Sequence, residues 1–245
     1  MEIVNGLWLG RNLTELEFMT MNSFTSFGHE FHLWHYWPLN TKPIRGNKKI
    51  IIRDAREILP EDRIFKYPDP MILGFGENSY VGLSEIFRYK VLYELGGWWS
   101  DMDVTCLKSL DEIETPYFFR FHGVLSIVGN IMKCPPNSEL MKLCWDRANN
   151  EINETTTDWH LAIRFLCYYV EFLGLDKYIR NDSCNLDRLE NVKPYLSVPG
   201  NLSDIPDHWN FIHWMNSVMK MMPLNSQSVY NKLIDKHCKH NRILI

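Results

Sequence analysis

Two aspartates separated by one residue, Asp101 and Asp103, follow an aromatic run near the middle of the chain. In an extended strand, residues two apart point to the same side, so both carboxylates face one side and Met102 faces the other. Two carboxylates that open on one side suit Mg²⁺ or Mn²⁺, which prefer oxygen ligands and often share them with a substrate phosphate. Because this tripeptide is common by chance, a solvated strand end is the alternative interpretation.

The residues around this pair predict a helix followed by a strand. Between residues 84 and 95, apolar residues recur at helical spacing, which predicts an amphipathic helix. Ser84 is placed to cap its N-terminus, and Gly96 and Gly97 end it. Residues 98–105 are aromatic, β-branched and acidic, and this mixture predicts a strand that enters the core.

The lengths of these two elements bring charged side chains together. The helix and a strand over residues 98–103 are each about 16 Å long. A tight glycine turn therefore returns the chain to the level of the helix start. Glu85 and Arg88 lie three residues apart on one helical face, so we expect them near Asp101 and Asp103.

Nearly thirty consecutive residues here resemble the sugar-binding region of the Asp-x-Asp glycosyltransferases of the retaining GT-A class. In that pattern a Ser-Asp-x-x-Arg helix runs into Gly-Gly-x-Tyr-x-Asp-x-Asp, and this chain has SEIFR followed by GGWWSDMD. The sequence most resembles the capsular-polysaccharide and α-1,4-glycosyltransferase branch of the glycosyltransferase family 32 type. That family is related to the catalytic domains of large clostridial glucosylating toxins. Glu85 stands where the family has Asp, and Trp99 where the toxin branch has Tyr.

The resemblance implies an α/β fold of the GT-A type, with a Rossmann-like nucleotide-binding sheet, flanking helices and a small acceptor-side lobe. It implies a divalent cation, Mn²⁺ or Mg²⁺, bound directly by Asp103, with Asp101 contacting the metal through water or contacting the donor ribose. Arg88 and Glu85 would orient the nucleotide sugar through its hydroxyl or phosphate groups. The catalytic candidates are therefore Asp101, Asp103, Arg88 and Glu85.

Three positions outside this stretch also match the family. His213 lies in a segment that resembles Ile-His-Leu-Trp-Asn and is the third metal-ligand candidate, with a structural histidine as the alternative. Trp8 occupies the place of a tryptophan that stacks on uracil in the toxin branch, and core packing is its alternative. Asn130 is a candidate for bonding a donor or acceptor hydroxyl, or else for supporting a turn. The donor-binding candidates are Trp8, Glu85, Arg88, Trp99, Asp101 and Asn130.

One departure from the family concerns the acceptor. The family has a Gly-Pro pair at the start of the helix predicted over residues 155–169, whereas this chain has Asp158 and Trp159. This leaves the acceptor open. Asp158 is either an acceptor contact or a plain N-cap of that helix.

The first half of the chain predicts alternating strands and helices. Residues 2–9 predict a strand, and Thr14 with Glu17 three residues later forms a capping box that opens a helix to about residue 27. The strand-helix-strand order makes the following strand a parallel neighbour of the first. Further elements predicted are strands over residues 30–37, 50–53 and 117–121 and a helix over residues 138–149.

Length and composition indicate one folded α/β domain spanning residues 1–245. Apolar residues make up 45% and charged residues 23%, as in ordinary globular proteins. The net charge of −4 gives no reason to expect a nucleic-acid partner, for which a basic surface would be needed. Six cysteines without Cys-x-x-Cys spacing predict buried free thiols and a reducing compartment.

The sequence also indicates where the protein acts. It shows no leader pattern and no apolar run of eighteen residues, which predicts a soluble, cytoplasmic protein. The tail from Lys232 carries basic residues after several methionines, so peripheral contact with a membrane bearing a lipid-linked acceptor is one interpretation. Core methionines and a solvated tail are the other. The oligomeric state stays open.

These features together predict a metal-dependent, retaining glycosyltransferase. It would move a hexose from a nucleotide sugar, a uridine diphosphate sugar being favoured by the resemblance, to a glycan or lipid-linked saccharide in polysaccharide synthesis. Two alternatives remain: a toxin-like transferase acting on a host protein, and a non-catalytic module that binds sugar nucleotides or glycans.

Overall fold

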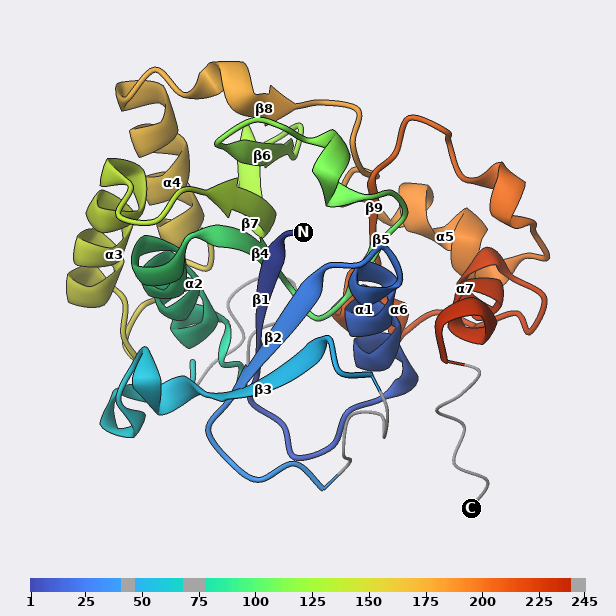
Figure 1. Ribbon diagram of the computed structural model, residues 1–245, viewed down its shortest axis with the longest axis horizontal. Coiled ribbons are helices and arrows are strands. Elements are labelled where there is room, and N and C mark those ends of the chain that lie inside the picture. Colours follow the sequence, from blue (N-terminus) through green and yellow to red (C-terminus); the bar gives the residue numbers. More distant parts are fainter. Residues whose placement is uncertain (41–46, 68–77, 239–245) are drawn as a thin grey trace.

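The computed structural model describes residues 1–40, 47–67 and 78–238. Within these ranges, a seven-stranded mixed sheet has the order β3-β2-β1-β4-β7-β6-β8, and β5 pairs with β9 in a small second sheet (Figure 1). The strands are β1 Ile3–Trp8, β2 Glu30–His35, β3 Ile50–Asp54, β4 Gly97–Ser100, β5 Val104–Cys106, β6 Phe118–Phe121, β7 Ile127–Cys134, β8 Ile179–Arg180 and β9 Phe211–His213.

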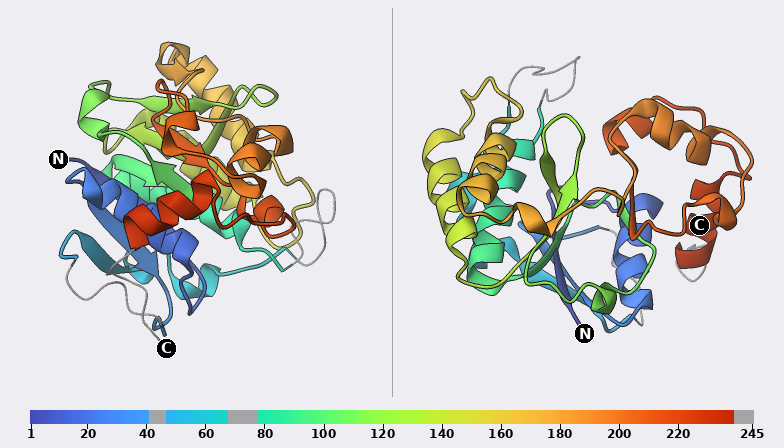
Figure 2. Two further views of the ribbon diagram at one scale, coloured as in Figure 1. Left: turned by 90° about the vertical axis from the view of Figure 1, so that its right-hand side faces the viewer. Right: turned by 90° about the horizontal axis from the view of Figure 1, so that it is seen from above.

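The helices cover both faces of the large sheet. They are α1 Glu15–Ser26, α2 Val81–Leu95, α3 Glu139–Glu151, α4 Leu161–Phe172, α5 Leu189–Ser197, α6 Asn216–Met219 and α7 Val229–Cys238. Figure 2 (right) shows α2, α3 and α4 together on one face, with α1 and α7 on the other. The α/β class predicted from the sequence is thus confirmed. No helix in the described ranges is long and apolar enough to cross a membrane.

The parallel part of the sheet forms as the sequence predicts. β1 pairs in parallel with β2 and β4, and β2 pairs in parallel with β3. The capping box is present: the Thr14 backbone N–H and hydroxyl both donate to Glu17 Oε2 at 2.6 Å. It starts α1, which packs against the sheet before the chain enters β2. Antiparallel pairing begins at β7, which lies beside β4.

Helix α2 begins one turn earlier than predicted, and Ser84 is not its cap. The helix starts at Val81, whose N–H donates to the Ser79 hydroxyl at 3.2 Å, and Ser84 donates its own N–H to the Tyr80 carbonyl at 2.9 Å. The added turn buries Leu83 in the core, so tertiary packing extends the helix beyond the local cap signal. Its end is as predicted, because Gly96 adopts a φ of +65°.

The strand predicted over residues 98–105 is divided in two. β4 belongs to the large sheet and β5 to the small one, and Asp101 and Asp103 lie in the turn between them. The Asp101 N–H donates to the Asn130 carbonyl at 2.7 Å, while the Asp103 carbonyl accepts from Trp214 N–H at 2.9 Å. The chain therefore changes hydrogen-bonding partners between the two aspartates, and Met102 packs into the core beneath them.

The C-terminal part forms a smaller lobe with its own apolar cluster, centred on Trp214 and the inner faces of α5 and α7. Figure 1 shows this lobe beside α1, at the side of the large sheet. All six cysteines carry free thiols, and five of them are buried. The lobe contributes β9 to the small sheet and so brings residues far along the chain next to β5.

Candidate active site

A cavity of about 320 Å³ opens where β4 ends, between α2, β7, the start of α4 and the C-terminal lobe. We call it the acidic cavity. Its polar wall includes Glu85, Arg88, Asp101, Asp103, Asn130, Asp187 and His213, and its apolar wall includes Val81, Trp159, Ile163, Met215 and Val218. Six of the eight residues predicted for the site line it. The structure therefore brings Asn130 and His213, from two distant segments of the chain, next to the central motif.

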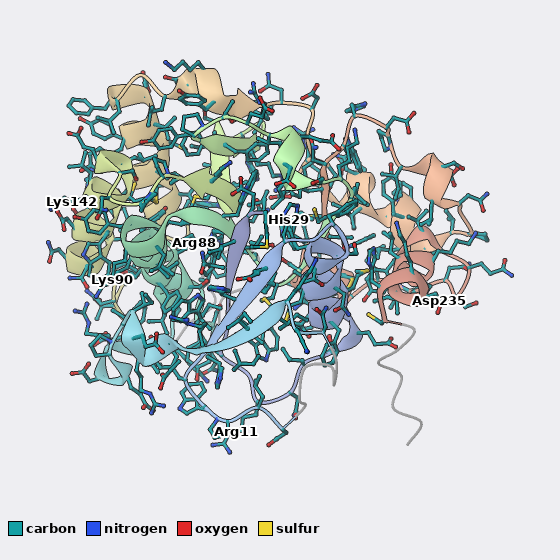
Figure 3. All side chains as sticks on the ribbon, in the orientation of Figure 1. Arg11, His29, Arg88, Lys90, Lys142 and Asp235 are labelled. Carbon is teal, nitrogen blue, oxygen red and sulfur yellow. The ribbon has the colours of Figure 1, made fainter. Side chains whose placement is uncertain are left out.

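Buried Arg88 and half-buried Asp101 form an ion pair that lines the cavity. Arg88 is 5% exposed, and its guanidinium lies 3.1 Å from Asp101 Oδ1 and 5.1 Å from the centre of the Trp99 ring. The Trp99 indole N–H donates to the same oxygen at 2.7 Å. Burial raises the pKa of Asp101, and the positive charge of Arg88 offsets part of that shift. Figure 3 shows Arg88 inside the molecule, whereas Lys90 and Lys142 lie on its outer side.

Glu85 is buried beside this pair, and among the described residues no ion pair joins it to a cation. Desolvation raises its pKa from an ordinary value of 4.5 to about 8; Arg88 opposes the shift and Asp101 adds to it. Its Oε2 atom is buried and has no hydrogen-bond partner among the described residues. At neutral pH the side chain is therefore mostly protonated and able both to donate and to accept a hydrogen bond.

The raised pKa of Glu85 predicts a pH-dependent stability. Because the folded state holds the proton up to about pH 8 while the unfolded state releases it near 4.5, the chain loses stability as pH rises through this window. Glu85→Gln stays neutral, so its free energy of unfolding should rise relative to wild type between pH 5 and 8. Urea denaturation with a chelator present measures this; parallel pH curves for the two proteins would contradict it.

Asn130 points an unpaired amide toward the cavity. It is 5% exposed, and both its Oδ1 and Nδ2 atoms are buried without a hydrogen-bond partner in the described structure. The residue lies within β7, so the alternative of a turn-supporting asparagine is wrong. Buried amides are nearly always hydrogen-bonded, and an orphaned one that lines a cavity is suited to a ligand's hydroxyl groups.

Gly129, next to Asn130, gives Arg88 its room. A Cβ atom at this position would lie 2.9 Å from Arg88 Nη1 and 3.3 Å from its Cδ. Gly129→Ala is therefore expected to displace the guanidinium and to lower turnover by about 10- to 100-fold, because small displacements of positioning groups are costly. Gly174→Ala is the control: a Cβ there meets no atom within 4 Å, but its φ is +64°, so it should cost stability and leave turnover unchanged. Wild-type turnover in Gly129→Ala would exclude this role for the glycine.

Asp103 faces His213 across the cavity wall. Asp103 Oδ1 lies 3.4 Å from His213 Nε2, and Oδ2 accepts from the Asn216 N–H at 2.9 Å. Burial acts to raise the pKa of Asp103, but the His213 charge and these hydrogen bonds bring it below its ordinary value. Burial lowers the pKa of His213, and Asp187 and Asp103 together raise it well above its ordinary value. His213 thus lies between two carboxylates, which favour its protonated form.

Asp187 and the residues that hold it were not identified from the sequence. Asp187 Oδ1 lies 2.7 Å from His213 Nδ1, and its carboxylate is paired with the buried Arg120 at 2.6 and 3.0 Å. Asn185 hydrogen-bonds the backbone N–H and carbonyl of His213 at 2.8 and 2.9 Å. No spacing along the chain relates these residues to His213, because their proximity arises only when residues 183–187 pack beside β9.

The donor atoms of Asp103 and His213 fit a shared divalent cation. Two atoms bound to one such ion at about 2.1 Å lie roughly 3.0–3.4 Å apart, and Asp103 Oδ1 and His213 Nε2 are separated by 3.4 Å. Among the described residues, no group of three His, Cys, Asp or Glu side chains is arranged to hold a metal. Asp101 is turned toward Arg88 and Trp99 instead. A two-ligand site is typical of Mg²⁺, whose other positions go to water and substrate phosphates.

The two remaining predicted donor-binding residues do not line the cavity. The Trp8 indole N–H donates to the Asn12 carbonyl at 3.0 Å, and the ring packs against the core cluster that holds Met102. Trp99 is 1% exposed and contacts two residues that line the cavity, Arg88 and Asp101.

The helix predicted over residues 155–169 begins only at Leu161, with His160 as its N-cap. Asp158 is therefore not that cap: its carboxylate accepts from the His160 N–H at 3.0 Å and pairs with Arg164. Asp158 does not line the cavity, whereas its neighbours Trp159 and His160 do. The first residues of the predicted range form a turn instead, in which Asn153 Oδ1 accepts from Thr155.

Comparison with known proteins finds a match for the middle of the chain. Residues 52–119 match the family model described as a glycosyltransferase sugar-binding region containing the DXD motif. That segment includes α2 and both aspartates, so the similarity covers the part of the chain that carries the central motif. A search of curated proteins finds no match.

Solved structures that align with most of the chain include two glycosyltransferases. The PaToxG glycosyltransferase aligns with a TM-score of 0.47 and 15% identity over 72% of this chain and 71% of its own. The apo form of glycosyltransferase GlyE from Streptococcus pneumoniae TIGR4 aligns with a TM-score of 0.42 and 10% identity, covering 96% of this chain and 62% of its own.

Proposed function

We propose that the chain is a metal-dependent glycosyltransferase that takes a hexose from a nucleotide sugar. The observation that carries this proposal is the convergence of Glu85, Arg88, Asp101, Asp103 and Asn130 on one cavity at the carboxyl end of β4. Crevices outside the carboxyl ends of strands are where α/β sheets bind nucleotides. Residues 1–245 would act as one catalytic domain.

The metal ligands in this proposal are Asp103 and His213, with Asp101 contacting the ion through water or contacting the donor ribose. Bound Mn²⁺ or Mg²⁺ would offset the negative charge that develops on the departing diphosphate. Asp103 is suited to this role because its low pKa keeps the carboxylate charged. Cation binding requires His213 to release its Nε2 proton, so binding should weaken at acidic pH.

The other polar residues orient the donor sugar. Arg88, held in place by Asp101 and Trp99, presents a fixed cation to hydroxyl or phosphate groups. Protonated Glu85 and the unpaired Asn130 amide can each bond sugar hydroxyls. We assign retention of the anomeric configuration by front-face attack, as the family resemblance implies. Trp8 would stack on the base, and Trp99 would support the donor site through Arg88.

The finer parts of the proposal concern the substrates. We favour a uridine diphosphate hexose as donor and a glycan or lipid-linked saccharide as acceptor in polysaccharide synthesis, in the cytoplasm or at the membrane surface. Trp159 and Ile163 on the apolar wall give a surface on which the apolar face of a sugar ring can pack.

A thermal-shift screen of nucleotide sugars with and without Mn²⁺ tests the donor part. A donor at 100 times its dissociation constant stabilises the native state by about 2.7 kcal/mol, which is about 5–10 °C in a chain of this size. The shift should require both Mn²⁺ and the nucleotide sugar and should be absent with chelator. If no nucleotide sugar raises the melting temperature, the proposed donor class is wrong.

Turnover separates this function from a non-catalytic binding module. A transferase moves the sugar to an acceptor or, slowly, to water, and it releases nucleoside diphosphate in either case. A binding module would show the thermal shift without this release. Incubation of the shifting donor with Mn²⁺ and a panel of saccharides, followed by chromatography of the nucleotide, decides between them. Release that depends on a protein acceptor would instead favour the toxin-like alternative.

A further inference from the structure

We infer that Asp187 is a positioning residue, which fixes the His213 ring so that Nε2 faces Asp103 and the acidic cavity. The inference deepens the proposed function and rests on it for the metal. It starts from the contacts of His213, whose side chain is 13% exposed and lies between the carboxylates of Asp103 and Asp187.

The His213 backbone is anchored separately from its ring. Asn185 Oδ1 accepts from the His213 N–H at 2.8 Å, and Asn185 Nδ2 donates to the His213 carbonyl at 2.9 Å. These bonds set the position of the Cα atom. They leave the ring free to turn about its own side-chain bonds, so a second contact must set the direction of its nitrogens.

Asp187 supplies that contact. Its Oδ1 lies 2.7 Å from Nδ1, and Nε2 on the opposite side of the ring is 3.4 Å from Asp103 Oδ1. Metal-binding histidines commonly donate the N–H of their second nitrogen to a carboxylate, which fixes both the tautomer and the ring orientation. With Nδ1–H donated to Asp187, the nitrogen left for a cation is Nε2, which faces the cavity.

Arg120 keeps Asp187 in place and charged. It is 1% exposed, and its two terminal nitrogens reach both carboxylate oxygens at 2.6 and 3.0 Å. A bidentate pair of this kind constrains the plane of the carboxylate as well as its position. Asp187 is thus held by Arg120 of β6 and in turn holds the ring of His213 in β9.

The test uses the full chain and the variant Asp187→Asn, which keeps the side-chain volume. The amide must turn its NH₂ group toward either Arg120 or His213 Nδ1, both of which donate hydrogen bonds, so it cannot hold the ring as the carboxylate does. We expect the His213 Nδ1–H proton resonance, assigned with His213→Gln in metal-free protein, to shift or disappear. Mn²⁺ affinity measured by calorimetry should fall by about 10- to 100-fold.

Asp54→Asn is the matched control, since Asp54 also pairs with an arginine but is 42% exposed and does not line the cavity. It should change neither the resonance nor the affinity. A folded Asp187→Asn protein with an unchanged resonance would overturn the inference, as would unchanged Mn²⁺ affinity. A changed resonance in a chain whose wild type binds no Mn²⁺ supports the orienting role and counts against the proposed function alone.

Discussion

Asp103→Asn is expected to lower Mn²⁺-dependent glycosyl transfer by at least about 10³-fold while leaving the fold intact. The change removes the charge that faces His213 and the cavity, and with it the stabilisation of the leaving diphosphate. The amide oxygen still accepts from the Asn216 N–H, which now bonds Oδ2 at 2.9 Å, so the local backbone keeps its hydrogen bond. Initial rates of nucleoside diphosphate release and the melting temperature measure the two effects.

Asp62→Asn is the control for this variant, because Asp62 is exposed and does not line the cavity. It should retain full activity. Asp103→Ala should be as inactive as Asp103→Asn and somewhat less stable, since it also removes the acceptor for Asn216. Full manganese-dependent transfer by folded Asp103→Asn would refute the role assigned to Asp103.

Arg120→Met is expected to destabilise the chain by about 3–5 kcal/mol, the largest stability effect predicted here. Arg120 is 1% exposed, and its removal leaves Asp187, 15% exposed, with two histidines as its remaining charge partners among the described residues, His213 at 2.7 Å and His122 at 3.8 Å. The Asp187 carboxylate then stays largely desolvated but has lost the bidentate ion pair that compensated for its burial. Urea denaturation at neutral pH measures the loss, which corresponds to about 6–20 °C in melting temperature.

An exposed ion pair provides the comparison. Arg56→Met breaks the pair with Asp54, whose side chains are 53% and 42% exposed, and should cost less than about 1 kcal/mol. The double variant Arg120→Met with Asp187→Asn should recover part of the loss, because it removes the charge left behind. Equal costs for Arg120→Met and Arg56→Met would show that the buried pair does not stabilise the C-terminal lobe.

Much of the fold could be predicted because its signals are local. The capping box of Thr14 and Glu17, the glycines after α2 and the apolar strands all act within a few residues of chain. The wrong predictions concern boundaries that distant residues set. Ser84 has good capping chemistry, yet packing of Leu83 extends α2 past it. The strand after Trp98 divides because Asn130 and Trp214 pair with different parts of it.

The candidate site divides in the same way. Glu85, Arg88, Asp101 and Asp103 lie within one helix-turn-strand unit, so element lengths alone place them together. Asn130 and His213 came from a family resemblance and also line the cavity.

By itself, then, the sequence determined which carboxylates and cations share the central motif and which chemistry they suit. The tertiary structure decided their charge states and supports, since desolvation of Glu85 and the pairing of Asp187 with Arg120 and His213 exist only in the folded chain. The physical reason is that residue spacing encodes local geometry, whereas burial and long-range hydrogen bonds depend on how separate segments pack.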